Sequence, residues 1–244
     1  MKGKLYGVSV GPGDPELITL KAKRTIEECG VIAYPVKASG ERSAAFDIIK
    51  GVVDASGKNI SELLFRMSPD KALRAADYSR AVDKLISILE SGNDICMITL
   101  GDVTVYSTFM RVGKDIESRG YEMELIPGVP SFCDGAARAK IPLMTGTEGL
   151  AVVSASEGSD LFRTAIDDFD NVVIMKAYDS MDRISEKIES LNEKPDVFVV
   201  SNAGLEDQYI GPLDKNARYG YFTTVIIKKH KAAGGRILGE QGRE

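Results

Sequence analysis

Residues 3–22 read Gly-Lys-Leu-Tyr-Gly-Val-Ser-Val-Gly-Pro-Gly-Asp-Pro-Glu-Leu-Ile-Thr-Leu-Lys-Ala, an apolar run that enters a glycine-rich turn. The run predicts a strand over 4–10, and Gly11 and Gly13 allow a tight turn that a ligand can approach closely. Asp14 stands where a helix N-cap belongs, and Pro15 has the fixed φ favoured at the first helical position. The stretch therefore predicts a strand, a loop and a helix, which is how α/β proteins build ligand sites.

The spacing of this loop differs from that of the two common phosphate-binding loops. A Walker loop needs Lys followed by Ser or Thr after its last glycine, whereas Gly13 is followed by Asp14 and Pro15. A dinucleotide fingerprint needs a third glycine at the position that Glu16 occupies. Asp14 and Glu16 would also repel an anion at this helix end. A purely structural turn therefore stays open for this segment taken alone.

Composition limits the class of protein. The chain has 244 residues, of which 43% are hydrophobic, and a formal net charge of −5. It is long for one ordinary domain, so we expect two domains or one large α/β unit. Because no apolar run could span a bilayer and the amino terminus lacks a secretory signal, we expect a cytoplasmic protein without a membrane partner. The acidic balance argues against general nucleic-acid binding.

Cysteine and histidine content excludes several kinds of site. Cys29, Cys96 and Cys133 lie far apart in the sequence, so we expect reduced, mostly buried thiols and neither a disulfide framework nor a zinc knot. His230 is the one histidine in the sequence, which excludes a multi-histidine metal site and a Ser-His-Asp triad elsewhere in the chain. We expect His230 on the surface and no protein-bound metal.

Strand-like and helix-like segments alternate along the chain, which is typical of α/β proteins. In the first half the predicted strands are 4–10, 31–35, 58–67, 94–100 and 122–126, and the predicted helices are 15–29, 43–53, 71–91, 108–119 and 131–139. In the second half the predicted strands are 150–156, 172–176, 196–201 and 221–228, and the predicted helices are 160–167 and 180–191. The segment 141–149 lacks periodicity and predicts a linker between domains 1–140 and 150–244, with a frayed tail after Lys231.

Three predicted strands of the first domain end in loops rich in Gly, Pro and Asp. These loops are 11–14, 101–106 and 127–131. In a parallel sheet the carboxyl ends of the strands share one edge, and α/β proteins hold ligands there. The sequence therefore predicts a ligand site at this edge, facing the second domain.

These three loops, in this order, resemble the tetrapyrrole methylase family over about residues 3–228. The family has a Gly-x-Gly-Asp-Pro opening, a Gly-Asp-Pro loop after the third strand and a Pro-Gly-x-Ser/Thr turn. Two positions depart from it, because Val103 stands where proline is usual and Pro130 where Ser or Thr is frequent. The strings 8–22 and 101–108 most resemble members that methylate C20 of precorrin-2 or cobalt-factor II, with cobalt-factor II slightly favoured.

The resemblance implies two α/β domains with S-adenosylmethionine folded in a cleft between them, unlike Rossmann-type methyltransferases, and a homodimer. By position in the motifs, it implies cofactor contacts at Pro12, Gly101, Asp102, Val103, Ser131, Phe132, Met175, Ala203, Thr223 and Thr224. Asp102 and Tyr106 are the candidates for a catalytic base, and the structural alternative for Asp102 is to cap the following helix. Methyl transfer to an electron-rich carbon depends chiefly on orientation.

The implied tetrapyrrole substrate carries many carboxylates, so a net-acidic enzyme needs a locally basic site. Arg66, Arg111, Arg138 and Lys176 are possible contributors, although each is also explained by a solvated surface. Two other functions stay open: methylation of another tetrapyrrole carbon, and a nucleotide-binding module without transferase activity.

Overall fold

The computed structural model describes residues 2–156, 158–205 and 207–229 of the chain. The chain divides into two compact units, Met1–Pro130 and Ser131–Glu244. This division falls before the predicted linker 141–149, because helix α5 (Ser131–Ala139) packs against strands of the second unit. The predictions for His230 and for the tail after Lys231 lie outside the described residues.

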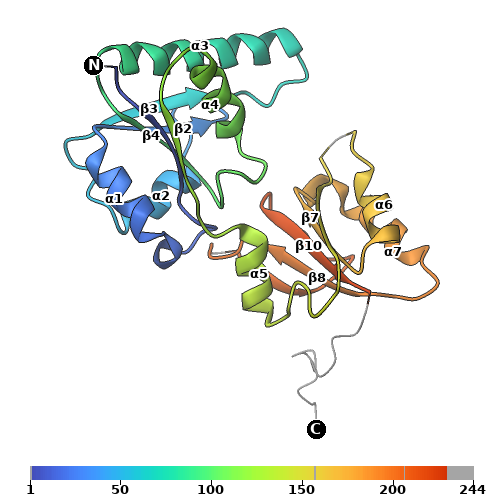
Figure 1. Cartoon of the computed structure of the whole chain (residues 1–244). Coiled ribbons are helices and arrows are strands. Elements are labelled where there is room, and N and C mark those ends of the chain that lie inside the picture. Colours follow the sequence, from blue (N-terminus) through green and yellow to red (C-terminus); the bar gives the residue numbers. More distant parts are fainter. Residues whose placement is uncertain (1, 157, 206, 230–244) are drawn as a thin grey trace. The chain divides into compact units, whose positions relative to one another are not determined.

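The first unit is a parallel sheet covered by helices on both faces. The five strands run in the order β3-β2-β4-β1-β5 and are β1 (Leu5–Ser9), β2 (Val31–Val36), β3 (Asn59–Leu64), β4 (Ile95–Thr99) and β5 (Met123–Ile126). The helices are α1 (Leu20–Glu28), α2 (Ala44–Lys50), α3 (Lys71–Glu90) and α4 (Thr108–Ser118). Figure 1 shows α1 and α2 on one face of the sheet and α3 and α4 on the other. All neighbouring strands of this sheet pair in parallel, which is the condition for the three predicted loops to share one edge.

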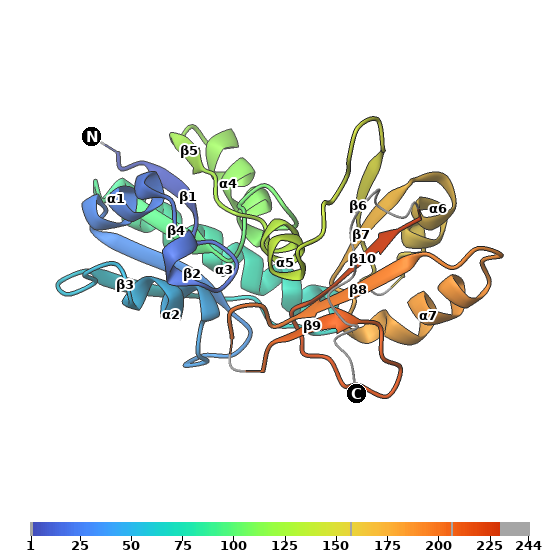
Figure 2. The same ribbon diagram turned by 90° about the horizontal axis from the view of Figure 1, so that it is seen from below.

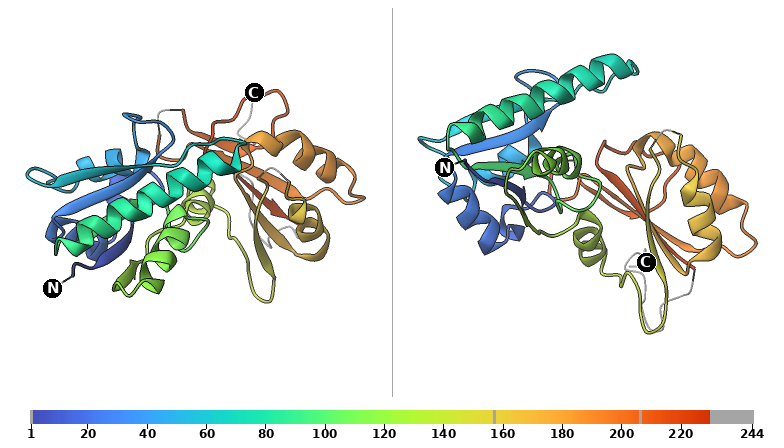
Figure 3. Two further views of the ribbon diagram at one scale, coloured as in Figure 1. Left: turned by 90° about the horizontal axis from the view of Figure 1, so that it is seen from above. Right: turned by 45° about the horizontal axis from the view of Figure 1, so that its top comes forward.

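Two apolar clusters hold these layers together. Phe109 of α4 and Leu85 of α3 are fully buried in the cluster on one face, and Ile26 of α1 is fully buried in the cluster on the other. In the left view of Figure 3, α3 lies beside α4 over the sheet. Helix α3 buries Leu85, whereas Leu73 in its first turn is exposed.

The predicted single helix over 15–29 is wrong, because the segment forms two helices. A 3-10 helix spans Pro15–Leu17, and Asp14 Oδ1 caps it by accepting the Glu16 N–H at 2.9 Å. The backbone is then extended, and Thr19 Oγ1 accepts the Ala22 N–H at 3.1 Å at the start of α1. The predicted cap at Asp14 is confirmed, and a second cap five residues later begins the true α-helix.

The second unit is a mixed sheet in the order β6-β7-β10-β8-β9. The strands are β6 (Leu150–Ser154), β7 (Asn171–Met175), β8 (Asp196–Ser201), β9 (Tyr209–Pro212) and β10 (Thr223–Lys228), and the helices besides α5 are α6 (Leu161–Asp168) and α7 (Met181–Glu189). Only β6 and β7 pair in parallel. Figure 2 shows β9, which was not predicted, beside β8 at the edge of the sheet. None of the helices in the described ranges is long and apolar enough to cross a lipid bilayer.

Candidate functional site

The three predicted loops meet at one edge of the first sheet. They follow β1, β4 and β5, and β1 lies between the other two strands. Gly11 and Gly101 form a two-way backbone bridge, in which the Gly101 N–H donates to the Gly11 carbonyl at 2.7 Å and the reverse bond measures 3.3 Å. Both glycines have a left-handed backbone, with φ of +81° and +71°, a conformation that residues with a side chain rarely adopt. The predicted convergence at the carboxyl edge is thereby confirmed.

Asp102 joins two of these loops. One carboxylate oxygen accepts the Gly128 N–H at 2.8 Å, and the other accepts the Thr104 N–H at 2.8 Å. Burial alone would raise the pKa of Asp102, but the hydrogen bonds from Gly128 and Thr104 outweigh burial and hold this pKa below its ordinary value. The structural alternative for Asp102, capping of the following helix, is wrong, because Ser107 caps α4 by accepting the Phe109 N–H at 3.1 Å.

The end of β1 contacts both other loops. The Val103 N–H donates to Ser9 Oγ at 2.8 Å, and the Val103 side chain is fully buried in the core. A Cβ on Gly128 would lie 2.5 Å from Ser9 Cβ and 3.0 Å from the Gly101 carbonyl oxygen. Only glycine therefore fits at position 128, and the valine that departs from the family pattern supplies an N–H that proline lacks.

Tyr106 and Pro12, at the same edge of the sheet, differ in solvent exposure. Tyr106 is 47% exposed and has a left-handed backbone with φ of +49°, which is uncommon for a residue other than glycine. Pro12 is buried within the opening loop. Of these two predicted site residues, Tyr106 is the one whose side chain reaches solvent.

In the second unit, most of the predicted cofactor residues gather around α5. Phe132, Met175 and Ala203 belong to one apolar cluster on the face of the sheet that α5 covers. Thr224, the second residue of β10, lies on the same face of the sheet as this cluster, because it is two residues from Ile226, a member of the cluster. Ser131 is the first residue of α5, directly before Phe132.

The side chain of Thr223 points to the opposite face of the sheet, where its hydroxyl forms hydrogen bonds with neighbouring residues. Its hydroxyl lies 3.0 Å from Ser201 Oγ and 2.5 Å from the Gly220 carbonyl oxygen. Thr223 is only 1% exposed. The side chain of Thr223 therefore fastens the start of β10, in contrast to that of Thr224.

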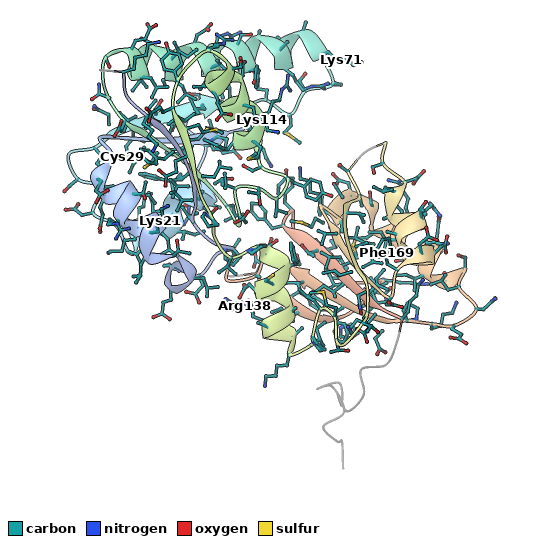
Figure 4. The ribbon with its side chains drawn as sticks, in the orientation of Figure 1. Lys21, Cys29, Lys71, Lys114, Arg138 and Phe169 are labelled. Carbon is teal, nitrogen blue, oxygen red and sulfur yellow. The ribbon has the colours of Figure 1, made fainter. Side chains whose placement is uncertain are left out.

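The four basic side chains predicted to meet substrate carboxylates have different surroundings. Arg66 makes a two-pronged ion pair with the buried Asp77, at 2.6 and 2.8 Å, and this pair lowers the pKa of Asp77 to about 2. Arg138, labelled on α5 in Figure 4, pairs with a carboxylate one turn earlier. The Arg111 guanidinium lies 4.2 Å from the ring centre of a tyrosine on α3. Lys176 is exposed directly after β7.

Sequence reasoning missed the serines that fasten these loops and a group of exposed aromatic residues. Ser9 and Ser201 each stand last in a strand, immediately before a loop with a left-handed residue. That position is a usable signal, because a buried hydroxyl there is available to loop N–H groups. Tyr221 and Phe222 precede β10, and consecutive aromatic residues at a strand end are a second such signal.

Cysteines and acidic residues give no sign of a metal centre. Cys29 and Cys96 are free and buried, as predicted, and Cys133 is free and half-buried. Among the described residues, no three His, Cys, Asp or Glu side chains gather as metal ligands would.

Known proteins are similar to this chain in sequence. The family model of tetrapyrrole (corrin/porphyrin) methylases matches residues 4–215. The chain is 38% identical over 235 residues to a probable cobalt-precorrin-2 C(20)-methyltransferase of Methanocaldococcus jannaschii, covering 93% of this chain and 97% of the relative. It is 30% identical over 233 residues to a cobalt-precorrin-2 C(20)-methyltransferase of Salmonella typhimurium, covering 94% of this chain and 98% of the relative.

A solved structure has the same fold. It is a uroporphyrin-III C-methyl transferase of Thermus thermophilus complexed with S-adenosyl homocysteine, with a TM-score of 0.67, 19% identity and coverage of 93% of this chain and 92% of that one. At this identity the likeness concerns the fold alone. The family model and the two relatives cover nearly the whole chain. The chain belongs to the tetrapyrrole (corrin/porphyrin) methylases.

Proposed function

We propose that this protein is an S-adenosylmethionine-dependent methyltransferase that methylates C20 of a corrin precursor in cobalamin biosynthesis. The observation that carries the proposal is the identity with the two C(20)-methyltransferases, which extends over more than nine-tenths of each chain. Both relatives are named for cobalt-precorrin-2. We therefore favour a cobalt-containing substrate over metal-free precorrin-2, and among cobalt-containing substrates we keep cobalt-factor II, the compound that the motif resemblance suggested.

The cofactor residues proposed from the motifs fit the chemistry of S-adenosylmethionine. When bound, this cofactor supplies a methyl group on a cationic sulfur together with an adenine ring. An adenine needs apolar side chains and backbone hydrogen-bonding groups, and Phe132, Met175 and Ala203 provide an apolar cluster at a strand edge. The glycine loops of the first unit allow close approach to their backbone. The placement of the cofactor between the two domains stays a prediction.

Asp102 and Tyr106 differ in how well they suit a base. Both Asp102 oxygens accept hydrogen bonds from the loops, and a pKa below the ordinary value makes this carboxylate a weaker proton acceptor. We therefore propose that Asp102 positions the cofactor loops. Tyr106 is the better placed candidate to contact a reacting group, because its side chain is half exposed at the same edge.

Catalysis in this proposal rests on orientation. The attacking carbon belongs to the substrate, so the protein has to hold two ligands in line and exclude water. The bonds of Asp102, Ser9 and Gly101 fix the three loops against one another. A rigid edge of this kind is suited to orienting a ligand without a protein nucleophile.

The test is methyl transfer by the purified protein under anaerobic conditions. The protein is incubated with S-adenosylmethionine and either cobalt-factor II or precorrin-2, and the product mass is followed. One added methyl group on one substrate is the expected result, and fragmentation assigns it to C20. Cofactor binding without transfer to either compound would overturn the proposal in favour of another tetrapyrrole or a binding module.

We further propose that the protein works in the cytoplasm, as expected from the lack of a bilayer-spanning run and of a secretory signal, and that it forms a homodimer, as the family resemblance implies. The oligomeric state is tested by light scattering of the purified chain at several concentrations. A monomer at all concentrations would exclude the dimer.

A further inference from the structure

Three aromatic side chains lie exposed at one end of the second sheet. Tyr178 and Tyr221 are each 47% exposed, and Phe222 is 42% exposed. The ring centres of Tyr178 and Tyr221 are 6.5 Å apart, and those of Tyr221 and Phe222 are 5.2 Å apart. We call these three residues the aromatic patch. Its central ring, Tyr221, contacts both of the others.

The patch is held in place by the backbone around it. The Ala177 N–H donates to the Thr223 carbonyl at 3.0 Å, which joins the segment of Tyr178 to the start of β10. The Asn202 N–H donates to the Phe222 carbonyl at 3.0 Å, and the Gly220 N–H donates to Ser201 Oγ at 2.8 Å. The loop that carries Tyr221 and Phe222 is therefore bonded to the end of β8 and the residue after it, at Gly220 and at Phe222 itself.

Close packing restricts this loop further. A Cβ on Gly220 would lie 2.1 Å from Asn202 Nδ2, and Asn202 itself has a left-handed backbone with φ of +51°. Because the backbone of this loop is held in place, its aromatic rings stay exposed to solvent. Grouped exposed apolar side chains are uncommon on soluble proteins unless they contact something.

The position of the patch connects it with the proposed cofactor residues. Phe222 is two residues from Thr224, and Tyr178 is three residues from Met175. β7 ends and β10 begins at this edge, so both neighbours lie on the same rim of the second sheet. Two exposed charged residues flank Tyr178 in the sequence. Lys176 lies two residues before Tyr178, and Asp179 directly follows it.

We propose that the aromatic patch binds the macrocycle of the tetrapyrrole substrate, an inference that rests on the proposed function. A tetrapyrrole has a broad apolar ring face, which aromatic side chains bind by stacking and edge contacts. Its rim carries carboxylates, for which Lys176 supplies a positive charge and the two tyrosines supply hydroxyl donors. The patch thereby positions the substrate and takes no part in the chemistry.

The experiment compares alanine substitutions in the patch with a matched control. Tyr221→Ala and Phe222→Ala remove one ring each, and Phe169→Ala removes a ring of the same 42% exposure that precedes β7 and is labelled in Figure 4. The readouts are KM and kcat for the tetrapyrrole, and the Kd of cobalt-factor II from its absorbance change in the presence of S-adenosylhomocysteine. The Kd of S-adenosylmethionine is measured on each variant as a check on folding and on the cofactor site.

Removal of one ring should raise the KM and the Kd for the tetrapyrrole about tenfold, as aromatic stacking with a flat ring does elsewhere. The kcat and the Kd of S-adenosylmethionine should stay within about twofold, since the patch acts on substrate binding alone. Tyr221→Phe should retain most of the affinity, because it keeps the ring. Phe169→Ala should match the wild type in all four constants.

Unchanged KM and Kd in both patch variants, with an active wild type, would overturn this inference and leave the proposed function intact. A wild type that transfers no methyl group would instead overturn the proposed function. If light scattering shows that Tyr221→Ala dissociates a dimer while the tetrapyrrole Kd is unchanged, the patch contacts a second copy of the chain, and the inference is wrong.

Discussion

Replacing Asp102 with asparagine tests whether this residue fastens the loops of the first unit. The carboxylate accepts the N–H groups of Gly128 and Thr104 through different oxygens. An asparagine has one oxygen and one NH2 group, so in either orientation one backbone N–H faces a donor. The substitution therefore removes one hydrogen bond outright and takes the charge from the other.

The expected cost follows from these two bonds. A hydrogen bond to a charged group contributes about 1.5–3 kcal/mol, and loss of the charge weakens the remaining bond by about half. We expect Asp102→Asn to lower the free energy of unfolding of the first unit by about 2–4 kcal/mol. The control is Asp83→Asn, whose carboxylate is 72% exposed and should change stability by less than about 0.5 kcal/mol.

The assay is urea denaturation followed by circular dichroism at several pH values. Because the folded-state pKa of Asp102 lies below its unfolded value, its contribution is complete above an unfolded pKa of about 3.9 and is lost as the pH falls through the folded pKa. The difference between wild type and variant should therefore be constant above about pH 5 and shrink below about pH 4. A variant as stable as the wild type that has lost kcat would refute the fastening role and favour Asp102 as a base.

Three further substitutions test the packing of the first unit. Gly128→Ala should destabilise this unit by about 1–3 kcal/mol through overpacking and should weaken cofactor binding. Gly30→Ala, which has open space at its Cβ, should change neither stability nor cofactor binding. Stability is measured by denaturation, and cofactor binding by titration. Val103→Pro should cost about 1 kcal/mol in the same denaturation assay, because it deletes the N–H that donates to the serine at the end of β1. Arg66→Ala should lower Tm at pH 7 and reduce the loss of stability between pH 4 and pH 2, because the folded pKa of Asp77 is about 2 only when Asp77 is paired with Arg66. An unchanged dependence of stability on pH would contradict this role of the ion pair.

Local sequence signals predicted the first unit well. The loops 11–14 and 101–106 follow apolar strands, and Gly11 and Gly101 have a left-handed backbone, whereas Gly13 does not. The parallel sheet was predictable because helical segments separate its strands. The helix after Asp14 was placed five residues early, since the sequence offers two successive caps and only tertiary packing selects Thr19 for the α-helix.

Other features depend on contacts that one sequence does not reveal. The order and directions of the strands in the second sheet follow from long-range pairing, and β9 is a short edge strand that contains glycine and proline. Arg66 was a candidate for substrate binding, but its partner Asp77 lies on the next helix, in a position that the apolar pattern marks as core. The face on which Thr223 and Thr224 each lie was likewise set by the register of β10.

The strand order of the first sheet has a consequence for synthesis on the ribosome. β1 leaves the ribosome first, yet Leu5 pairs with Ile95 on one side and with Met123 on the other. β2 and β3 can pair much earlier, because they follow each other in the chain. The glycine loop after β1 therefore emerges long before the strands that flank it, and its final shape is acquired only after β5 has been made.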